Sequence, residues 1–348
     1  MTFEIGIMTF GEVTQDPTNS TIRTPHQRAR ETIELATVAD EVGLDVFGMG
    51  EHHRSDFVGS APTIVLAAAA EATKRIRLSS AVTVLSSDDP VRVWEQFATI
   101  DLLSAGRAEI IAGRGSYTES FPLFGYDLAD YSELFREKLD MLLRIREQNP
   151  LTWTGKLRPP IVNADIAPRP YGETIPIWVG AGGSPASALS TGTLGLPLAM
   201  AILFGPMHML QDSARLYRAA AERAGHDSVS LPLSMSVGGY VGSSPKRARD
   251  IMYPHFAAFM MEHNHQRGRG MALSREAFDA GASPGGSYIV GDGEEVTDKI
   301  LRFREMYGLT RIIIQIGMGS MSHKDLLAGV ERLGTEVVPA IRSELGDD

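Results

Sequence analysis

"LDVFGMGEHH" (Leu44–His53) is the stretch that decides the fold. It begins as a short apolar run, which is typical of a buried strand, and it ends with an acid and two adjacent histidines. The segment before it, "RARETIELATVADEVG", has apolar residues at helical spacing. A helix therefore leads into a buried strand, and the carboxyl end of that strand carries polar side chains.

The same alternation continues along most of the chain. Eight segments are typical of strands, and each is followed by a helical pattern: "FEIGIM", "DVFGMG", "IRLSSAVTVL", "RAEIIAGRG", "IPIWVGAGG", "LPLAMAIL", "LPLSMSVGGYV" and "RIIIQIGMG". Alternation of this kind predicts a parallel sheet with right-handed crossovers. Eight units favour a closed (β/α)8 TIM barrel, an α/β fold, over an open sheet.

We predict one domain over residues 1–348, with insertions after strand 4 and strand 7. The first lies at about 149–174 and is rich in Pro and Gly, and the second lies at about 260–286. An open sheet that binds a dinucleotide would need G-x-G-x-x-G at the first helix, and no such run follows "FEIGIM".

The composition excludes several classes of function. Lys and Arg number 33 against 43 Asp and Glu, so the formal net charge is −10, which argues against nucleic acid or an anionic membrane as partner. There is no cysteine, so disulfides and thiolate chemistry are excluded. The N-terminus lacks a basic region and no apolar tract reaches about 20 residues, so we expect a cytoplasmic protein.

Glu51, His52 and His53 follow the second strand. Active sites of TIM barrels lie at the carboxyl ends of the strands, so this triplet is expected at the functional rim. Adjacent strand-end residues point opposite ways, so one histidine is expected to line the pocket and the other to pack sideways, against Glu51 or the next loop. A rim histidine can act as a general base or a hydrogen-bond donor, and it can also simply hold the loop. No metal site is predicted, because two adjacent histidines are poor ligand geometry.

"SAGRAEIIAGRGSY" places Arg107 at the start of the fourth strand and Arg114 at its end. Glycines flank Arg114, so that a ligand can approach the backbone there. An arginine in this setting indicates an anion or a planar ring, although a surface salt bridge is the simpler alternative. Tyr117, which follows this motif, is expected in the same pocket as Glu51 and His53.

"WVGAGGSPASA" runs from a strand through Gly182, Gly183 and Ser184 into a helix with Pro185 near its start. Free backbone N–H groups and the positive end of the helix dipole predict a phosphate site, whereas an ordinary Gly-Ser-Pro helix start is the alternative. In the third strand, Ser79, Ser80 and Ala81 are unusually small. Their size leaves room for something flat across the strand ends, whereas packing against a large neighbour is the alternative.

With these motifs in place, the chain resembles the bacterial luciferase-like flavin-dependent monooxygenase family over nearly its whole length. The resemblance rests on "ADEVGLDVFGMGEHH", "LSSAVTVL", "DPVRVWEQFATIDLLSAGR", "GRGSY", "VGAGGSPAS" and "GLTRIIIQIGMG". It implies a barrel that binds FMN at its carboxyl rim, often as a homodimer. A separate flavin reductase would supply reduced FMN, which reacts with O2 to a C4a-peroxyflavin that oxygenates a small organic substrate.

Carried to this chain, the resemblance implies that His52 is the active-site histidine. It implies that Ala81 lies under the isoalloxazine ring, and a non-prolyl cis bond is expected between Ser80 and Ala81. It further implies that Arg107 and the Gly182–Ser184 turn hold the phosphate, with Arg114 beside the flavin.

Two departures from the family pattern bear on the activity. Gly113 stands where the luciferase α-chain has a cysteine, so light emission is not implied. Gly182 replaces an acid of the luciferase phosphate turn, which gives backbone donors more weight at this turn.

Three rival functions remain open. Relatives with this barrel transfer hydride with the deazaflavin F420, and others keep the fold and bind flavin without catalysis. A barrel hydrolase or aldolase would need a strand-end Lys or clustered carboxylates. The apolar helix "APTIVLAAAAEATK" is either a dimer face or is buried under the N-terminal loop, and "HNHQRGRG" is either a mobile lid or a surface loop.

Overall fold

The computed structural model describes residues 2–266 and 272–346. Among these residues, eight parallel strands close into a barrel, because β10 pairs with both β12 and β9 at the two ends of the strand order. The predicted (β/α)8 barrel is confirmed. In order around the barrel, the strands are β1 (Glu4–Thr9), β2 (Val46–Met49), β3 (Arg77–Ser80), β5 (Ala108–Gly113), β8 (Ile177–Ala181), β9 (Leu198–Ile202), β10 (Leu233–Val241) and β12 (Arg311–Gln315).

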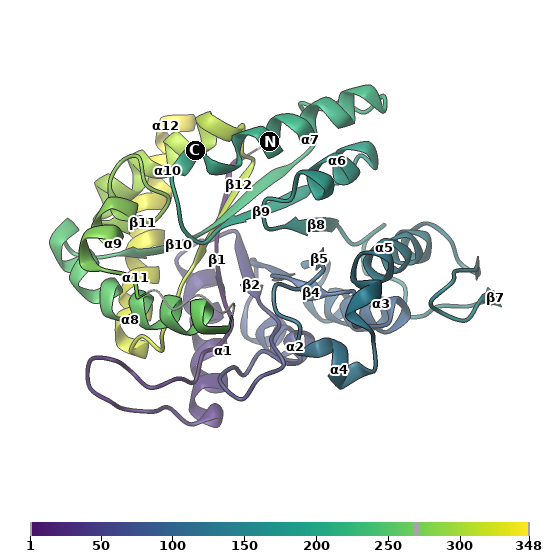
Figure 1. Cartoon of the computed structure of the whole chain (residues 1–348), viewed down its shortest axis with the longest axis horizontal. Coiled ribbons are helices and arrows are strands. Elements are labelled where there is room, and N and C mark those ends of the chain that lie inside the picture. Colours follow the sequence, from purple (N-terminus) through teal and green to yellow (C-terminus); the bar gives the residue numbers. More distant parts are fainter. Residues whose placement is uncertain (1, 267–271, 347–348) are drawn as a thin grey trace.

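Helices surround the strands, which lie at the centre of the view in Figure 1. Many begin with a proline in the first turn, where the missing N–H costs nothing. The surrounding helices are α1 (Pro25–Glu41), α2 (Pro62–Ala72), α3 (Pro90–Ser104), α5 (Tyr131–Glu147), α6 (Pro185–Thr193), α7 (Gln211–Arg223), α10 (Gly293–Tyr307), α11 (His323–Arg332) and α12 (Val338–Leu345).

Both predicted insertions are present. The first carries an antiparallel hairpin of β6 (Leu151–Trp153) and β7 (Ile161–Ala164), which lies at one edge of the molecule in Figure 1. The second is more helical than the sequence suggested, since it contains α8 (Pro245–Gln266) and α9 (Arg275–Ala282) before β11 (Ile289–Gly291). Of the segment "HNHQRGRG", residues 267–270 lie outside the described residues.

The inside of the barrel is layered from charged to apolar to small side chains. At the amino ends of the strands, Arg311 binds the Glu109 carboxylate through two hydrogen bonds of 2.6 and 2.9 Å and stacks on Trp178. The next layer is apolar and consists of Met8, Val46, Ile111, Trp178 and Ile313. Small residues such as Gly48, Ala81, Gly113 and Gly180 follow at the carboxyl ends of the strands.

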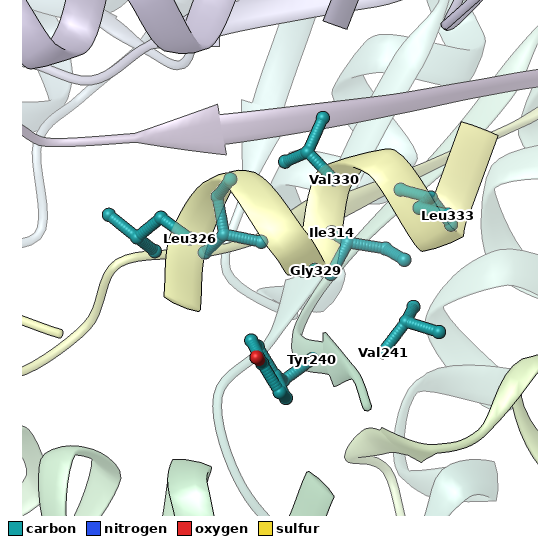
Figure 2. Close-up of a pocket in the computed structure, with 8 residues that line it drawn as sticks. Tyr240, Val241, Ile314, Leu326, Gly329, Val330 and Leu333 are labelled. Atoms are coloured by element: carbon teal, nitrogen blue, oxygen red, sulfur yellow. The ribbon is translucent and has the colours of Figure 1, made fainter. Parts of the chain in front are cut away.

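A small apolar gap lies between β10, β12 and α11 (Figure 2). Its volume is about 10 Å³, which is no more than a single water molecule needs. Gly329 lets α11 approach the sheet, because a Cβ at this position would lie 2.8 Å from the Tyr240 ring. This gap is a feature of core packing and does not hold a ligand.

Among the described residues, no helix has the length and apolar character that crossing a bilayer requires.

Candidate functional site

His52 lies buried in an aromatic enclosure at the carboxyl rim of the barrel. Its ring centroid is 4.6 Å from that of Phe10 and 4.7 Å from that of Phe57, and the ring of Tyr117 meets it edge-on at 4.5 Å. Its backbone N–H donates to the Gly59 carbonyl at 3.1 Å. The histidine is therefore held from three sides, in the place that the strand-end rule predicts.

His53 turns the other way, as expected for an adjacent residue. Its Nε2 lies 2.9 Å from Glu51 Oε1, and this hydrogen bond raises the pKa of His53. Glu51 is also buried and accepts a hydrogen bond from the Val84 N–H. The contact of His53 with Glu51 agrees with the prediction that one of the two histidines packs against Glu51.

Glu51 and His53 line a cavity of about 230 Å³ beside the start of α2. His52, Tyr117 and Arg114 do not line this cavity. Glu51 and His53 were expected in one pocket with Tyr117, and the structure instead separates them from the aromatic enclosure.

The floor of the barrel mouth is made of small side chains. A Cβ on Gly48 would lie 3.0 Å from the Cβ of Ala81, and Cβ atoms on Gly113 and Gly180 would lie 2.5 and 2.7 Å from the side chain of Val82. Val82 thus fills the space that the two glycines leave. Ala81 and Val82 are half-buried and form an apolar floor at the strand ends.

The expected non-prolyl cis bond exists one residue later than predicted, between Ala81 and Val82. The sheet explains the shift. The Ala81 N–H still donates to the Met49 carbonyl at 2.8 Å, and Ser80 Oγ bridges the backbone of Ile111. β3 ends at Ser80, one residue before the cis bond, and the chain then pairs again with β5 as β4 (Thr83–Val84).

Arg114 lies beside the first turn of α6. One of its guanidinium nitrogens donates to Ser187 Oγ at 3.1 Å, and the group lies over the Tyr131 ring. Ser184 is the N-cap residue of α6, but its side chain makes no capping hydrogen bond, and Gly183 has a φ of +92° that favours glycine. The turn 182–184 and Arg114 together offer backbone donors, a hydroxyl and a positive charge to an anion.

Arg107 does not belong to this group. It precedes β5 at the amino end of the barrel, whereas the 182–184 turn follows β8 at the carboxyl end. Its guanidinium donates to carbonyls of Ala70, Thr73, Ile76 and Ser104. The structure therefore contradicts the predicted phosphate contact of Arg107, because that side chain ties α2 and α3 to the opposite rim.

Tyr117 connects the enclosure to the second insertion. Its hydroxyl lies 2.8 Å from Nδ1 of His263, a buried residue of α8. Tyr117 thus lies beside His52, a contact that the sequence did not predict, and its partner on α8 is far away in sequence.

Sequence reasoning missed Glu119. Its Oε1 lies 3.2 Å from Nδ1 of His52 and 3.4 Å from the His53 N–H. An acid 67 residues after the histidine gives no spacing signal, and only the meeting of the loops after β2 and β5 brings the two side chains together.

Among the described residues, no group of three or more His, Asp or Glu side chains is suited to hold a metal ion.

The buried carboxyl group of Glu12 makes the stability of the folded chain depend on pH. Burial raises the pKa of this carboxyl from 4.5 to about 8, although the Gly319 N–H and the Arg28 charge oppose the shift. The folded chain thus keeps a proton that the unfolded chain releases, so stability is expected to fall between about pH 5 and 8, by about 1.4 kcal/mol per pH unit. Urea unfolding at several pH values measures this slope. Glu12→Gln should flatten it, and an unchanged slope in that variant would contradict the assignment.

The comparisons with known proteins agree with the fold. Residues 3–310 match the family model described as luciferase-like monooxygenase. The N-acetyl-S-alkylcysteine monooxygenase of Bacillus subtilis is 30% identical over 195 residues, which cover 55% of this chain and 56% of that protein.

Two solved structures share the fold over nearly the whole chain. The oxygenating constituent of 3,6-diketocamphane monooxygenase from Pseudomonas putida, in complex with FMN, has a TM-score of 0.78 at 20% identity and covers 97% of this chain and 98% of its own. An F420-dependent secondary alcohol dehydrogenase also reaches 0.78 at 20% identity, with coverage of 98% and 100%. From the family match over most of its length, we conclude that this chain belongs to the luciferase-like monooxygenase family.

Proposed function

We propose that this protein is an FMN-dependent monooxygenase that uses reduced FMN and O2 to oxygenate a small organic substrate. The observation that carries the proposal is the buried His52 in its aromatic enclosure, on the same barrel rim as Arg114 and the open turn 182–184. The anion site formed by Arg114 and the turn 182–184 suits the phosphate of a flavin. His52 and the apolar rings around it suit proton transfer in an oxidation that is protected from water.

The residues present fit a flavin. The apolar floor of Ala81 and Val82 suits a planar ring, and the turn 182–184 with Arg114 suits the phosphate. Gln315 lies at the upper end of β12, where its buried Nε2 has no hydrogen-bond partner among the described residues. An amide donor left unpaired inside the mouth is suited to a polar edge of the ring.

When bound, reduced FMN supplies two electrons, so that one atom of O2 enters the substrate and the other leaves as water. The chain orients and shields this reaction. His52 can hold or give a proton at Nε2, and the rings of Phe10, Phe57 and Tyr117 exclude water around it. A separate flavin reductase is proposed as the source of the reduced cofactor.

Hydride transfer with F420 is the second candidate, because an F420-dependent dehydrogenase matches the fold as well as the FMN-bound monooxygenase does. The family match and the 30% identical monooxygenase favour FMN. The test is an anaerobic titration of the protein with reduced FMN and, in parallel, with reduced F420, followed by rapid mixing with O2. Binding of FMN with slow return of the oxidised-flavin absorbance supports the proposal, and tight binding of F420 alone would overturn it.

Ala201→Leu is expected to weaken FMN binding by about 10-fold or more, or about 1.4 kcal/mol. Ala201 is an exposed strand residue in register with Ser236, whose Oγ contacts Met8 inside the barrel, so a larger side chain would project into the mouth. Fluorescence titration measures the affinity. Ala219→Leu, on the exposed face of α7, is the matched control and should bind FMN like the wild type. Equal affinities in both variants would place the cofactor elsewhere.

We also propose a homodimer that uses α2. Ile64 on this helix is 67% exposed, so the N-terminal loop does not bury it, and Leu102 and Leu103 on the neighbouring α3 are about half exposed. Exposed apolar patches of this kind are typical of interfaces. Light scattering should give twice the chain mass, and Ile64→Glu should shift the protein towards the monomer. A wild-type monomer at micromolar concentration would contradict this proposal.

A further inference from the structure

We propose that Glu119 is the positioning residue of His52: its carboxylate holds the imidazole proton on Nδ1 and thereby presents Nε2 to the reacting molecules. The role assigned to Nε2 rests on the proposed function, but the hydrogen bond and its effect on the ring do not. Glu119 lies in the β5–α4 loop, just before α4 (Ser120–Phe124), whereas His52 follows β2.

The first step is the contact itself. Glu119 Oε1 lies 3.2 Å from His52 Nδ1, and both side chains are largely shielded from water. Glu119 occupies the N-cap position of α4, yet its side chain makes no capping hydrogen bond to that helix. Its carboxylate instead lies within hydrogen-bond distance of His52 Nδ1 and accepts, at 3.4 Å, from the His53 N–H. The Glu119 carboxylate thus contacts the loop after β2 and does not cap its own helix.

The second step concerns which atom carries the proton of this hydrogen bond. Burial acts to raise the pKa of Glu119, but the hydrogen bond with His52, the bonds from backbone N–H groups and the charge of His52 together outweigh it, and the pKa lies below its ordinary value. An ionised carboxylate only accepts hydrogen bonds, so Nδ1 of His52 must carry the hydrogen. When the ring is neutral, Nε2 therefore has the lone pair, and when the ring is charged, Nε2 has a proton to give.

The third step is the fixed orientation of the ring. Phe10 and Phe57 pack at 4.6 and 4.7 Å, and Tyr117 lies edge-on at 4.5 Å, so these rings restrict rotation of the imidazole. His52 Nε2 has no hydrogen-bond partner among the described residues. One nitrogen is thus held by Glu119, and the other is left for a ligand. Partners that orient a metal-bound histidine contribute about 10–100-fold to activity, and we expect an effect of that order for Glu119.

The test needs no cofactor. Long-range ¹⁵N–¹H spectra of the full chain, labelled at histidine and recorded where the rings are neutral, report which nitrogen carries the proton. The signals missing from His52→Ala identify His52. In the wild type we expect His52 with its proton on Nδ1, and in Glu119→Gln a mixture of both forms, because an amide can donate or accept.

Glu51→Gln is the matched control, since Glu51 is a buried acid that pairs with the neighbouring His53. It should change the His53 signals and leave those of His52 unchanged. A wild-type His52 with its proton on Nε2 would overturn the proposal without any variant. An unchanged His52 in Glu119→Gln would overturn it as well.

A second readout separates this proposal from the proposed function. After mixing with O2, the slow return of the oxidised-flavin absorbance should become about 10–100-fold faster in Glu119→Gln and be partly restored in Glu119→Asp, which keeps the charge. If the wild type binds no FMN but shows the expected His52 proton, the function fails while the role of Glu119 stands. If FMN binds and Glu119→Gln reacts like the wild type, the positioning role fails and the function stands.

Discussion

Replacement of His52 by alanine is expected to lower oxygenation turnover by about 10²–10⁴-fold, the usual contribution of a general acid or base. The ring is buried among Phe10, Phe57 and Tyr117, so its removal takes away the proton-transfer group and also opens a void in the enclosure. FMN affinity should change much less, because Arg114 and the turn 182–184 stay intact. The loss should therefore appear in the reaction with O2 rather than in binding.

Stopped-flow absorbance measures this effect. Wild-type protein loaded with reduced FMN should regain the oxidised-flavin absorbance slowly after mixing with O2, and His52→Ala should approach the rate of free FMN. His53→Ala is the matched control, because that ring faces Glu51 and the separate cavity beside α2. Equal losses in the two variants would contradict the distinction that the structure draws between the adjacent histidines.

The architecture could be predicted from the sequence because it depends on periodic patterns. The eight strand segments and their helices follow from local runs of apolar residues, and parallel pairing with closure follows from their alternation. The rim location of His52 and the turn 182–184 required only the rule that strand ends carry the site. These features repeat along the chain, so the order of the residues is enough to find them.

The contacts inside the site could not be predicted in the same way. Glu119 reaches His52 from a loop 67 residues away, and Tyr117 reaches His263 over 146 residues. These pairs depend on how loops fold over the rim, which local patterns do not describe. The shift of the cis bond to Ala81–Val82 has the same origin, since hydrogen bonds from two neighbouring strands decide where β3 ends.

The correction for Arg107 has a geometric reason. A parallel barrel brings all strand starts to one rim and all strand ends to the other. Arg107 directly precedes β5 and Arg114 directly follows it, so the two arginines lie at opposite rims although they are close in sequence. Only Arg114 contacts the first turn of α6, through Ser187. The position of a residue within its strand therefore outweighs its resemblance to a family motif.

A buried ion pair lies inside the barrel at the amino ends of the strands, and the strand patterns did not indicate it. Arg311 and Glu109 are 2% and 1% exposed and share two short hydrogen bonds, and Glu4 accepts a further one from Arg311 at 2.7 Å. The positive charge of the buried Arg311 guanidinium is compensated while Glu109 and Glu4 are present, because both carboxylates accept hydrogen bonds from it. A pair of this kind adds little net stability, but removal of Arg311 leaves the buried Glu109 carboxylate with only the more distant Arg77, whose Nε lies 3.8 Å away, and the Ser79 hydroxyl.

Arg311→Met is therefore expected to lower the free energy of unfolding by about 3–5 kcal/mol. Urea unfolding followed by circular dichroism measures the loss. Arg332→Met is the matched control, because Arg332 forms an equally short pair with Glu336 at the surface, where such pairs contribute about 1 kcal/mol or less. The double variant Arg311→Met/Glu109→Met removes both charges and should recover a large part of the loss. If it were as unstable as the single variant, the cost would come from lost packing on Trp178 rather than from the unpaired Glu109 carboxylate.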